Sequence, residues 1–475
     1  MFRQLLRTLS KPAAPTAAAA SEAGRSADPR VAQVLAAHAA AQLRYAELLE
    51  PARAADAPPA LLLDFAQAAY AQERDGECEQ ALRRVLALEP DHALAHYSLA
   101  LLIANDARLP EAETHLRQAL ARAPTDLNVR LTLAMVLLGR SQYPEGYRLF
   151  RARRDGPCFS APHIAALPEW SGEALAGKTL VLWSDWGGFG DDIAYARIAR
   201  AIRERLAPER LIVAARRPML RLLAGQPYID EAVDLSAKIE AGFQCPLIDS
   251  VNALGADFDT LPTWPAYIEA PAAELKYWSE RLRGERRLKV GIVWTSTSVP
   301  PVEAGWVGRS DKHLPNAALA ALGGMPGVVS GPGGIPGSVS GPGGMPGVVF
   351  VSLQKGADIP PAAQLLPGSA VLDETEDLGD FADTAALLRQ LDLVVAIDTA
   401  VGHLAGALGV PTLLLLKRGR GYFWPLERED TPWYPSVRMV VQPRLRDWDA
   451  VLAKVRATIE RRAAGVPWPQ CYDQD

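Results

Sequence analysis

The sequence predicts an α-helical repeat region followed by an α/β region made of two Rossmann-like domains. Up to about residue 156 the pattern is helical and repeats with a fixed period, and beyond it short apolar strands alternate with helical stretches. Such alternation implies parallel sheets, because each strand returns to its sheet through a helix. A chain of 475 residues is long enough for several domains.

Composition excludes several classes of protein. The formal net charge is −5 and there is no long basic block, which argues against nucleic acid as a partner. The four cysteines are widely scattered without a CxxC pair, which argues against a disulfide framework or structural zinc and fits a reducing compartment. No segment reaches about 18 uninterrupted apolar residues, the length of a membrane span. We therefore expect a cytoplasmic protein.

The N-terminal part repeats. Residues 1–26 are rich in Ala, Ser and Pro and are expected to form a flexible arm. In residues 27–157, Pro90 and Pro124 lie 34 residues apart, and each closes a similar helical phrase. Small residues recur in register at Ala66, Ala100 and Ala134, and large ones at Leu82, Leu116 and Phe150.

A period of 34 residues with these small and large positions resembles the tetratricopeptide repeat, or TPR. Repeats begin near Pro59, Ala93 and Leu127. Such repeats stack into a solenoid with a concave face suited to peptides. The alternative is that these helices only buttress the domain that follows.

Two series of strands follow. We expect one Rossmann-like domain over residues 158–285 and a second over 286–445, with a cleft between them. The final segment, 446–475, is expected to hold a helix that crosses back to the first domain, and a tail. The predicted strands are Thr179–Ser184, Leu211–Ala215, Lys289–Trp294, Val348–Leu353, Leu393–Ile397 and Thr412–Leu416.

One segment does not fit this alternation. Residues 323–347 consist of a tandem ten-residue repeat of Gly, Pro and Ser between a helix and a strand. Such a composition cannot form a core, so we expect a disordered insert without a catalytic role.

The stretch from Leu391 to Gly409 is the centre of the second series. Its buried strand ends at Asp398 and Thr399, which suit a turn, and a short helix follows. At the carboxyl edge of a parallel sheet, the free N–H groups of a helix's first turn form an anion site. The alternative is an ordinary strand–helix turn with a capping Asp.

Several short motifs, in this order behind the repeats, carry a family resemblance. They are Pro168–Lys178, Gly187–Ile193, Val290–Trp294, Val351–Gly356, Asp377–Thr384, Asp398–His403 and Pro432–Pro435. The set resembles bacterial TPR-containing glycosyltransferases related to heptosyltransferases (glycosyltransferase family 9). The resemblance implies a GT-B fold, with the acceptor at the first Rossmann-like domain and a nucleotide-sugar donor at the second, and neither catalytic metal nor other cofactor.

On the acceptor side the resemblance makes Asp191 the general base that deprotonates the acceptor hydroxyl, in preference to Asp192. Gly188 and Gly190 allow the backbone to approach a ligand there. A positioned base contributes typically 10²–10⁴-fold to such a reaction. The alternative is that the two carboxylates only cap a helix that begins near Ile193.

On the donor side, Lys312 resembles the lysine that holds the donor's phosphates, and Arg309 can grip them bidentately. Thr295 follows a strand and offers a hydroxyl donor. The alternative reading makes Arg309 and Lys312 part of a solvated loop.

The motif at Asp398, Thr399, Gly402 and His403 matches the family signature at the donor's phosphates. Here Gly402 is expected to keep the approach open and His403 to act as an imidazole donor. Gln354 ends another strand and is expected to touch the nucleotide. Relatives differ from this chain at Lys417–Trp424, the loop expected to border the donor sugar.

The expected function is inverting, metal-independent transfer of a sugar from a nucleotide-sugar to an acceptor hydroxyl. Asp191, Lys312 and His403 are its catalytic residues, and the TPR face presents a protein or glycan acceptor. This requires Asp191 and His403 to face each other across one interdomain cleft. The alternatives are a non-catalytic TPR scaffold with a degenerate GT-B domain, and a GT-B phosphorylase or epimerase.

Overall fold

The computed structural model describes residues 42–156, 161–255, 263–296, 313–323, 345, 347–356, 359–426 and 428–473. These residues belong to two compact units, which divide between Thr132 and Leu133. The expected arm at 1–26, Arg309, Lys312 and most of the insert at 323–347 lie outside the described residues.

The first unit is helical. After a helix over residues 42–53, its helices are α4 (Pro59–Ala71), α5 (Asp75–Leu88), α6 (Ala93–Asn105) and α7 (Leu109–Arg122). α4 packs on α5, α5 on α6 and α6 on α7. α8 (Leu127–Gly139) spans the division between the units.

The repeat register appears in this helical region. Pro59, Ala93 and Leu127 are the first residues of α4, α6 and α8, as the period predicts. Ala66, Ala100 and Ala134 have no exposed surface, as expected of small residues where helices pack closely. The helical region is confirmed, and its identity as a TPR solenoid stays a prediction.

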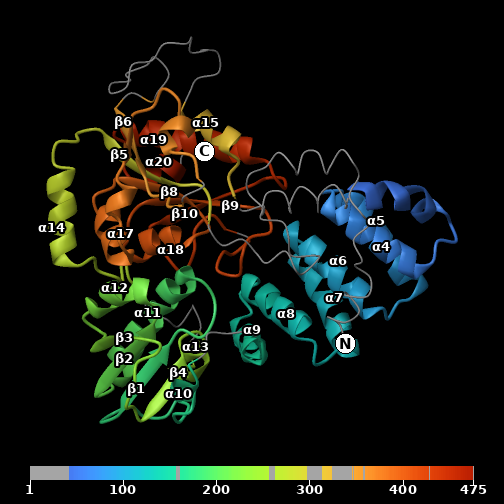
Figure 1. The fold of residues 1–475 in the computed structure, drawn as a ribbon, viewed down its shortest axis with the longest axis horizontal. Helices are drawn as coiled ribbons and strands as arrows, with labels where there is room; N and C mark the ends of the chain where they lie inside the picture. The colour runs from blue at the N-terminus through green and yellow to red at the C-terminus, as the bar shows by residue number, and fades with distance from the viewer. Residues whose placement is uncertain are drawn as a thin grey trace, which may run out of the picture. The chain divides into compact units, whose positions relative to one another are not determined.

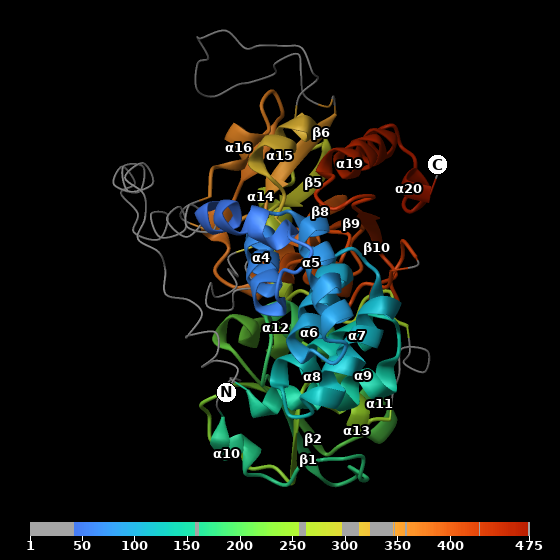
Figure 2. The ribbon, with the colours of Figure 1, turned by 90° about the vertical axis from the view of Figure 1, so that its right-hand side faces the viewer.

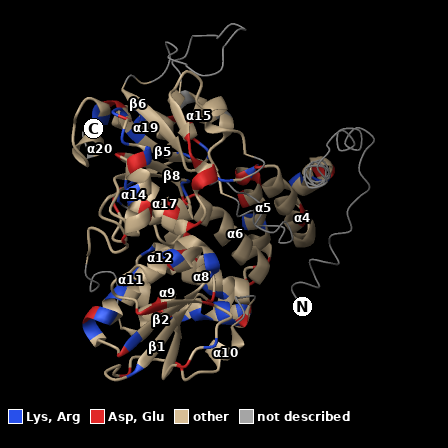
Figure 3. Cartoon of the chain, turned by 60° about the vertical axis from the view of Figure 1, so that its left-hand side comes forward, with Lys and Arg blue, Asp and Glu red and all other residues tan. Residues whose placement is uncertain are grey.

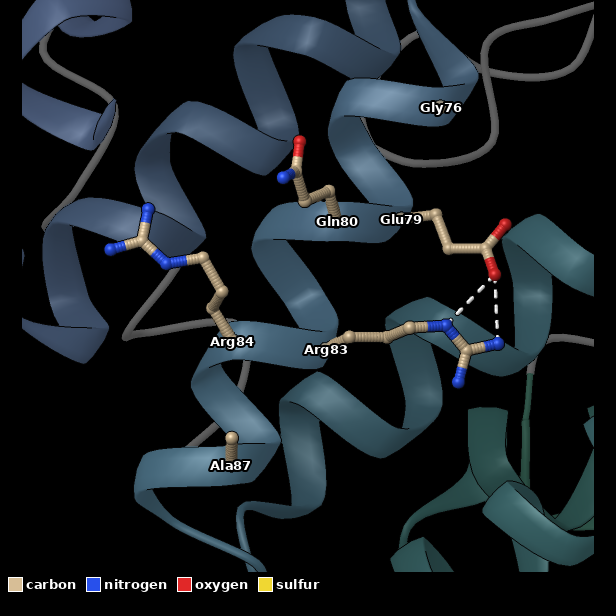
Figure 4. Close-up of a pocket in the computed structure, with 6 residues that line it drawn as sticks. All are labelled: Gly76, Glu79, Gln80, Arg83, Arg84 and Ala87. Carbon is tan, nitrogen blue, oxygen red and sulfur yellow. Dashed lines mark hydrogen bonds and ion pairs between the residues drawn. The ribbon is translucent and has the colours of Figure 1, made fainter. Parts of the chain in front are cut away.

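One face of α5 lines an open pocket with Gly76, Glu79, Gln80, Arg83, Arg84 and Ala87 (Figure 4). The arginines of this pocket bond other residues of the first unit. Arg83 pairs with Glu79 at 2.7 Å and also bonds Glu111. The Arg84 guanidinium donates to the carbonyl oxygens of Ala52 and Ala54.

The second unit contains two parallel sheets (Figure 1). Each sheet with its helices forms one lobe; β1–β4 belong to the first lobe and β5–β10 to the second. The sheet of the first lobe has the order β3-β2-β1-β4. Its apolar strands lie between helices on both faces, which explains why they read as short continuous hydrophobic runs. The strands are β1 (Thr179–Trp183), β2 (Arg210–Ala215), β3 (Glu231–Asp234) and β4 (Phe243–Pro246), and the helices α10 (Pro162–Ala165), α11 (Phe189–Leu206), α12 (Leu220–Ala224) and α13 (Ser250–Ala253).

The sheet of the second lobe has the order β10-β9-β8-β5-β6-β7. Its strands are β5 (Leu288–Val293), β6 (Val348–Ser352), β7 (Val371–Asp373), β8 (Leu393–Ile397), β9 (Thr412–Leu416) and β10 (Val437–Val441). Its helices are α14 (Ala272–Arg281), α15 (Asn316–Gly323), α16 (Ala362–Leu365), α17 (Phe381–Leu388), α18 (Ala400–Ala407), α19 (Trp448–Ala463) and α20 (Gln470–Asp473). Two parallel α/β lobes behind a helical region confirm the expected GT-B-like fold.

Helices of the two lobes meet between the sheets. α11 packs on α18, and α12 packs on α17 (Figure 1). Arg221 of α12 binds Asp380 bidentately, at 2.8 Å to each carboxylate oxygen, and also bonds Asp383 of α17 at 2.7 Å. The rings of Phe189 and Phe381 lie 5.0 Å apart between the same lobes. A polar link and an apolar link thus join the lobes.

α9 (Tyr143–Phe150), the last helix of the predicted repeats, belongs to the second unit. Arg153, in the short 3₁₀ turn that follows α9, is fully buried and bonds Asp249 at 2.7 Å and Asp185 at 2.9 Å. The ring of Phe150 packs edge-on against Trp186 at 5.2 Å. A charge is stable at such a site only with paired partners, so these ion pairs fix α9 on the first lobe.

Two details differ from the sequence-based expectations. The C-terminal helix does not cross back: Trp448, Val451 and Val455 of α19 are buried in the core of the second sheet, and α19 lies beside α15 (Figure 2). The apolar face of this helix packs against the sheet of its own lobe. α11 begins at Phe189 rather than near Ile193, which places Asp191 and Asp192 in its first turn. The domain bounds stay a prediction.

Charges of both signs are interspersed over the described part of the chain (Figure 3). Among the described residues, no group of three or more His, Cys, Asp or Glu is arranged to hold a metal ion. In the same residues, no helix has the length and apolar character needed to cross a membrane.

Candidate functional site

The N-terminus of α11 forms the first-lobe side of the candidate site. Gly187 has φ +89°, a conformation that L side chains rarely adopt, and it turns the chain from β1 toward α11. A Cβ on Gly187 would stand 2.5 Å from Oδ2 of Asp191, so the glycine also makes room for this carboxylate. Gly188 is the N-cap residue.

Both carboxylate oxygens of Asp191 accept hydrogen bonds. The backbone N–H of Gly188 donates to Oδ2 at 2.7 Å, and the hydroxyl of Tyr422 donates to Oδ1 at 2.7 Å. Burial raises the pKa of the Asp191 carboxyl above its ordinary value, and these two bonds and the nearby His403 imidazole oppose part of the rise. A carboxylate in such surroundings binds a proton more readily than one in water.

The N-terminus of α18 forms the second-lobe side. His403 is 4% exposed; its Nδ1 is hydrogen-bonded to the Tyr434 hydroxyl at 2.7 Å, and its Nε2 lies 3.6 Å from a carboxylate oxygen of Asp398. The rings of Phe423 and Trp424 pack on the imidazole at 4.8 and 4.9 Å. The imidazole therefore has a fixed orientation.

Gly190 is the point of contact between the two helix N-termini. A Cβ on Gly190 would stand 2.7 Å from Cδ2 and 3.3 Å from Nε2 of His403. The structure therefore brings His403 beside the turn that carries Asp191. The cleft expected between these two residues stays a prediction. The roles assigned to these residues stay predictions.

The Asp192 carboxylate is bonded to side chains of its own lobe. It is 3% exposed, accepts from the Ser184 hydroxyl at 2.6 Å and pairs with Arg216 at 2.6 Å. Burial raises the pKa of Asp192 to about 6 against these partners. Because the oxygens of Asp192 are bonded within the first lobe, Asp191 is better placed than Asp192 to act as the general base.

The predicted donor-side residues form local bonds at the end of β5. The side-chain amide oxygen of Gln354 accepts from the backbone N–H groups of Trp294 and Thr295 at 3.1 and 2.9 Å, and the Thr295 hydroxyl is hydrogen-bonded to His313. Gln354 thus closes the open end of a strand. The sequence analysis missed His313, although it directly follows Lys312.

The turn before α18 differs in part from its expected role. Thr399 is the N-cap residue, but its side chain makes no capping bond and instead donates to the carbonyl of Ile397 at 3.3 Å. The expectation that Gly402 keeps a ligand approach open is wrong. A Cβ there would stand 2.8 Å from Cδ1 of Leu414 and 3.2 Å from the carbonyl oxygen of Ile397, so the glycine lets α18 pack on its sheet.

The loop after β9 supplies residues that the sequence analysis overlooked. Two arginines of this loop bond backbone carbonyls: Arg418 donates to Pro443 at 2.7 Å and Arg420 to Pro425 at 2.9 Å. Burial lowers the pKa of Arg420 to about 10. The residues of this loop that contact Asp191 and His403 are the aromatic residues 422–424. Three consecutive aromatic residues in a loop were the sequence signal that could have identified them.

Comparison with known proteins bears on the second lobe. Residues 378–446 match the model of glycosyltransferase family 9 (heptosyltransferase). This part of the chain is a heptosyltransferase-like glycosyltransferase segment. The matched segment includes His403 and Tyr422 and does not include Asp191.

Among curated proteins, the chain is 27% identical over 367 residues to Protein FlbA of Caulobacter vibrioides, covering 69% of this chain and 54% of FlbA. The chain thus spans about half the length of this relative.

Similar solved structures include a glycosyltransferase family 9 protein from Veillonella parvula, at 11% identity and a TM-score of 0.42 over 63% of this chain and 93% of that one. The E. coli heptosyltransferase WaaC with ADP-2-deoxy-2-fluoro heptose has 12% identity and a TM-score of 0.37, over 60% and 99%. A Thermobaculum terrenum O-GlcNAc transferase mutant has 15% identity and a TM-score of 0.23, over 90% and 95%. With TM-scores below 0.5, these likenesses do not decide the arrangement of this chain.

Proposed function

We propose that this protein transfers a sugar from a nucleotide-sugar to an acceptor hydroxyl, with inversion and without a metal ion. The observation that carries the proposal is the juxtaposition of a half-buried carboxylate, Asp191, with the α18 N-terminus that holds His403. The match of residues 378–446 to a glycosyltransferase family supports the same reaction class.

In this reaction Asp191 takes the proton of the acceptor hydroxyl as its oxygen attacks the anomeric carbon. The new bond joins that oxygen to the sugar, and the bond from the sugar to the nucleoside diphosphate breaks. The proton ends on Asp191 and the electron pair on the departing phosphate. A raised pKa suits this role because the base must hold a proton in the transition state.

The departing diphosphate needs positive groups aimed at it. We assign this role to the N–H groups of α18's first turn, with His403, Asp398 and Thr399 shaping the turn. Lys312 and Arg309 complete the phosphate site in this proposal. Gln354 and Thr295 act indirectly, by ordering the neighbouring strand end.

The helical repeats are proposed to dock a protein or glycan acceptor. The groups proposed to react with the substrates all lie outside the repeats in the sequence.

Turnover of a donor panel tests the proposal. The unchanged protein is incubated with UDP-, GDP- and ADP-sugars, and release of nucleoside diphosphate is measured with and without EDTA. Asp191→Asn is the test variant. Asp447→Asn is the matched control, because Asp447 only caps α19 through the N–H of Ala450 at 3.3 Å, and Asn can cap equally well.

The expected result is turnover that survives EDTA, is lost in Asp191→Asn and is retained in Asp447→Asn. Full activity of Asp191→Asn would refute the assignment of the base. No turnover and no thermal stabilisation by UDP, GDP or ADP would favour a non-catalytic scaffold.

A further inference from the structure

A chain of three tyrosine hydroxyls ends on Asp191. The Tyr422 hydroxyl donates to Oδ1 at 2.7 Å, and the Tyr195 hydroxyl interacts electrostatically with that of Tyr422. The hydroxyls of Tyr147 and Tyr195 lie 3.2 Å apart. The three residues come from α9, α11 and the loop after β9, so three separate elements meet in this chain.

Packing holds this chain in place. Tyr195 is fully buried and Tyr147 is 2% exposed, with their rings edge-on at 6.3 Å. The ring of Tyr422 stacks on Phe423 at 4.3 Å and contacts Phe150 of α9 at 5.5 Å. Because an unbonded buried hydroxyl is costly, phenols at these positions depend on one another as partners.

The charge of Asp191 sets the direction of the chain. An ionised carboxylate can only accept, so Tyr422 donates to it. The Tyr422 oxygen is then free to accept from Tyr195, and the Tyr195 oxygen from Tyr147. Each donation polarises the next hydroxyl, which strengthens the bond that reaches the carboxylate.

We propose that Tyr422, backed by Tyr195 and Tyr147, is a positioning residue that orients the Asp191 carboxylate and keeps it ionised for catalysis. The inference rests on the proposed function, in which Asp191 is the base. It gives α9 a direct part in the site, because Tyr147 begins the chain and Phe150 supports the ring of Tyr422.

Other titratable groups also face Asp191, and the test must separate them from the tyrosines. His403 favours the ionised form and Asp398 disfavours it. The full set comprises Tyr422 and Tyr434 from second-lobe loops, His403 and Asp398 at α18, Asp192 and Tyr195 on α11, and Tyr147 on α9.

Single Tyr→Phe substitutions test the chain, because each removes one hydroxyl and keeps the ring. We expect the acid limb of the kcat/KM profile to move to higher pH, most for Tyr422→Phe, less for Tyr195→Phe and least for Tyr147→Phe. At a pH on that limb, Tyr422→Phe should lose about tenfold in kcat/KM, as for loss of one hydrogen bond to a charged group.

Tyr228→Phe is the matched control. Tyr228 is a buried tyrosine of the same lobe whose hydroxyl donates to the carbonyl of Tyr267 at 2.8 Å, outside the chain that ends on Asp191. This variant loses a buried hydroxyl as the others do, but its pH profile should not move.

A second readout needs no activity. With ¹³C-aspartate labelling, infrared difference spectra against Asp191→Asn isolate the titration of this carboxyl group. Tyr422→Phe should move that titration to higher pH and Tyr228→Phe should not. If Tyr422→Phe and Tyr228→Phe titrate alike, the inference is overturned.

The two failures are distinguishable. Absence of sugar transfer by the unchanged protein counts against the proposed function. An unmoved carboxyl titration and pH profile in Tyr422→Phe, in a protein that transfers sugar, counts against the positioning role alone.

Discussion

Helices α11 and α18 begin alike, but their glycines serve opposite sides. Each follows a parallel strand and a polar turn and carries a glycine in its first turn. Gly190 of α11 faces outward, where a Cβ would strike the ring of His403, whereas Gly402 of α18 faces inward against Leu414 and Ile397. One glycine permits contact between the lobes, and the other permits packing of a helix on its own sheet.

The same contrast holds for the neighbouring acids. Asp191 faces the other lobe and receives Tyr422 from it, whereas Asp192 faces inward to Ser184 and Arg216. Side chains one residue apart on a helix point in different directions, so adjacent acids have different environments. A local motif therefore does not tell which of its residues serve a ligand.

The largest effect expected is the difference between these two acids. Asp191→Asn should lower transfer by about 10²–10⁴-fold with little loss of stability, because Asn keeps the shape of the side chain. Asp192→Asn should instead destabilise the fold, because it weakens the buried pairing with Arg216. Initial rates and chemical denaturation of both variants measure this. Equal activity loss with equal stability loss would remove the distinction.

The pH dependence of transfer is the second test. Asp191 acts as a base only when ionised, and burial raises its pKa, so activity should rise with pH along a limb above the range of an ordinary Asp. Below that pKa, kcat/KM should fall about tenfold per pH unit. A kcat/KM profile at constant ionic strength measures the limb. A flat profile down to the usual range of Asp would contradict the assignment.

The two glycines give the third test. Gly402→Ala should destabilise the protein by about 1–3 kcal/mol, because a methyl group overpacks the helix against backbone of its sheet. Gly190→Ala should mainly lower kcat by displacing His403. Gly76→Ala is the control, since nothing lies within 4 Å of a Cβ there. Denaturation midpoints and kcat of the three variants decide; an unchanged kcat in Gly190→Ala would argue against close contact at His403.

The smallest effect concerns the support of the imidazole. Tyr434→Phe removes the hydroxyl bonded to Nδ1 of His403 and leaves a buried nitrogen without that partner. Stability should fall by about 1 kcal/mol, with a modest loss of activity. Urea denaturation measures the first and initial rates the second. A stabilised variant would mean that this hydrogen bond is not formed.

Much of the fold was predictable from sequence because its signals are local. The strands Leu393–Ile397 and Thr412–Leu416 have the predicted bounds, since each is a β-branched or leucine run between turn residues. The direction of α19 was not predictable. Its apolar stripe says that one face is buried, but not against which lobe.

The site was predictable where a motif holds its own chemistry and not where chemistry arrives from a distance. Asp191 and His403 stand in short motifs and were identified as candidates. Tyr422 reaches Asp191 from 231 positions away in the chain, and Tyr434 lies 31 positions from His403. No local pattern encodes such pairings, because they depend on how the lobes pack.

The bridge made by Arg221 has a consequence for how the lobes respond to salt. The Arg221 side chain is about half exposed, at 49%, so water and dissolved ions reach its pairs with Asp380 and Asp383. Dissolved ions screen such pairs, over about 8 Å at physiological ionic strength, but leave the Phe189–Phe381 contact intact. High salt should weaken the ion pairs of Arg221 between the lobes and leave the apolar contact unchanged.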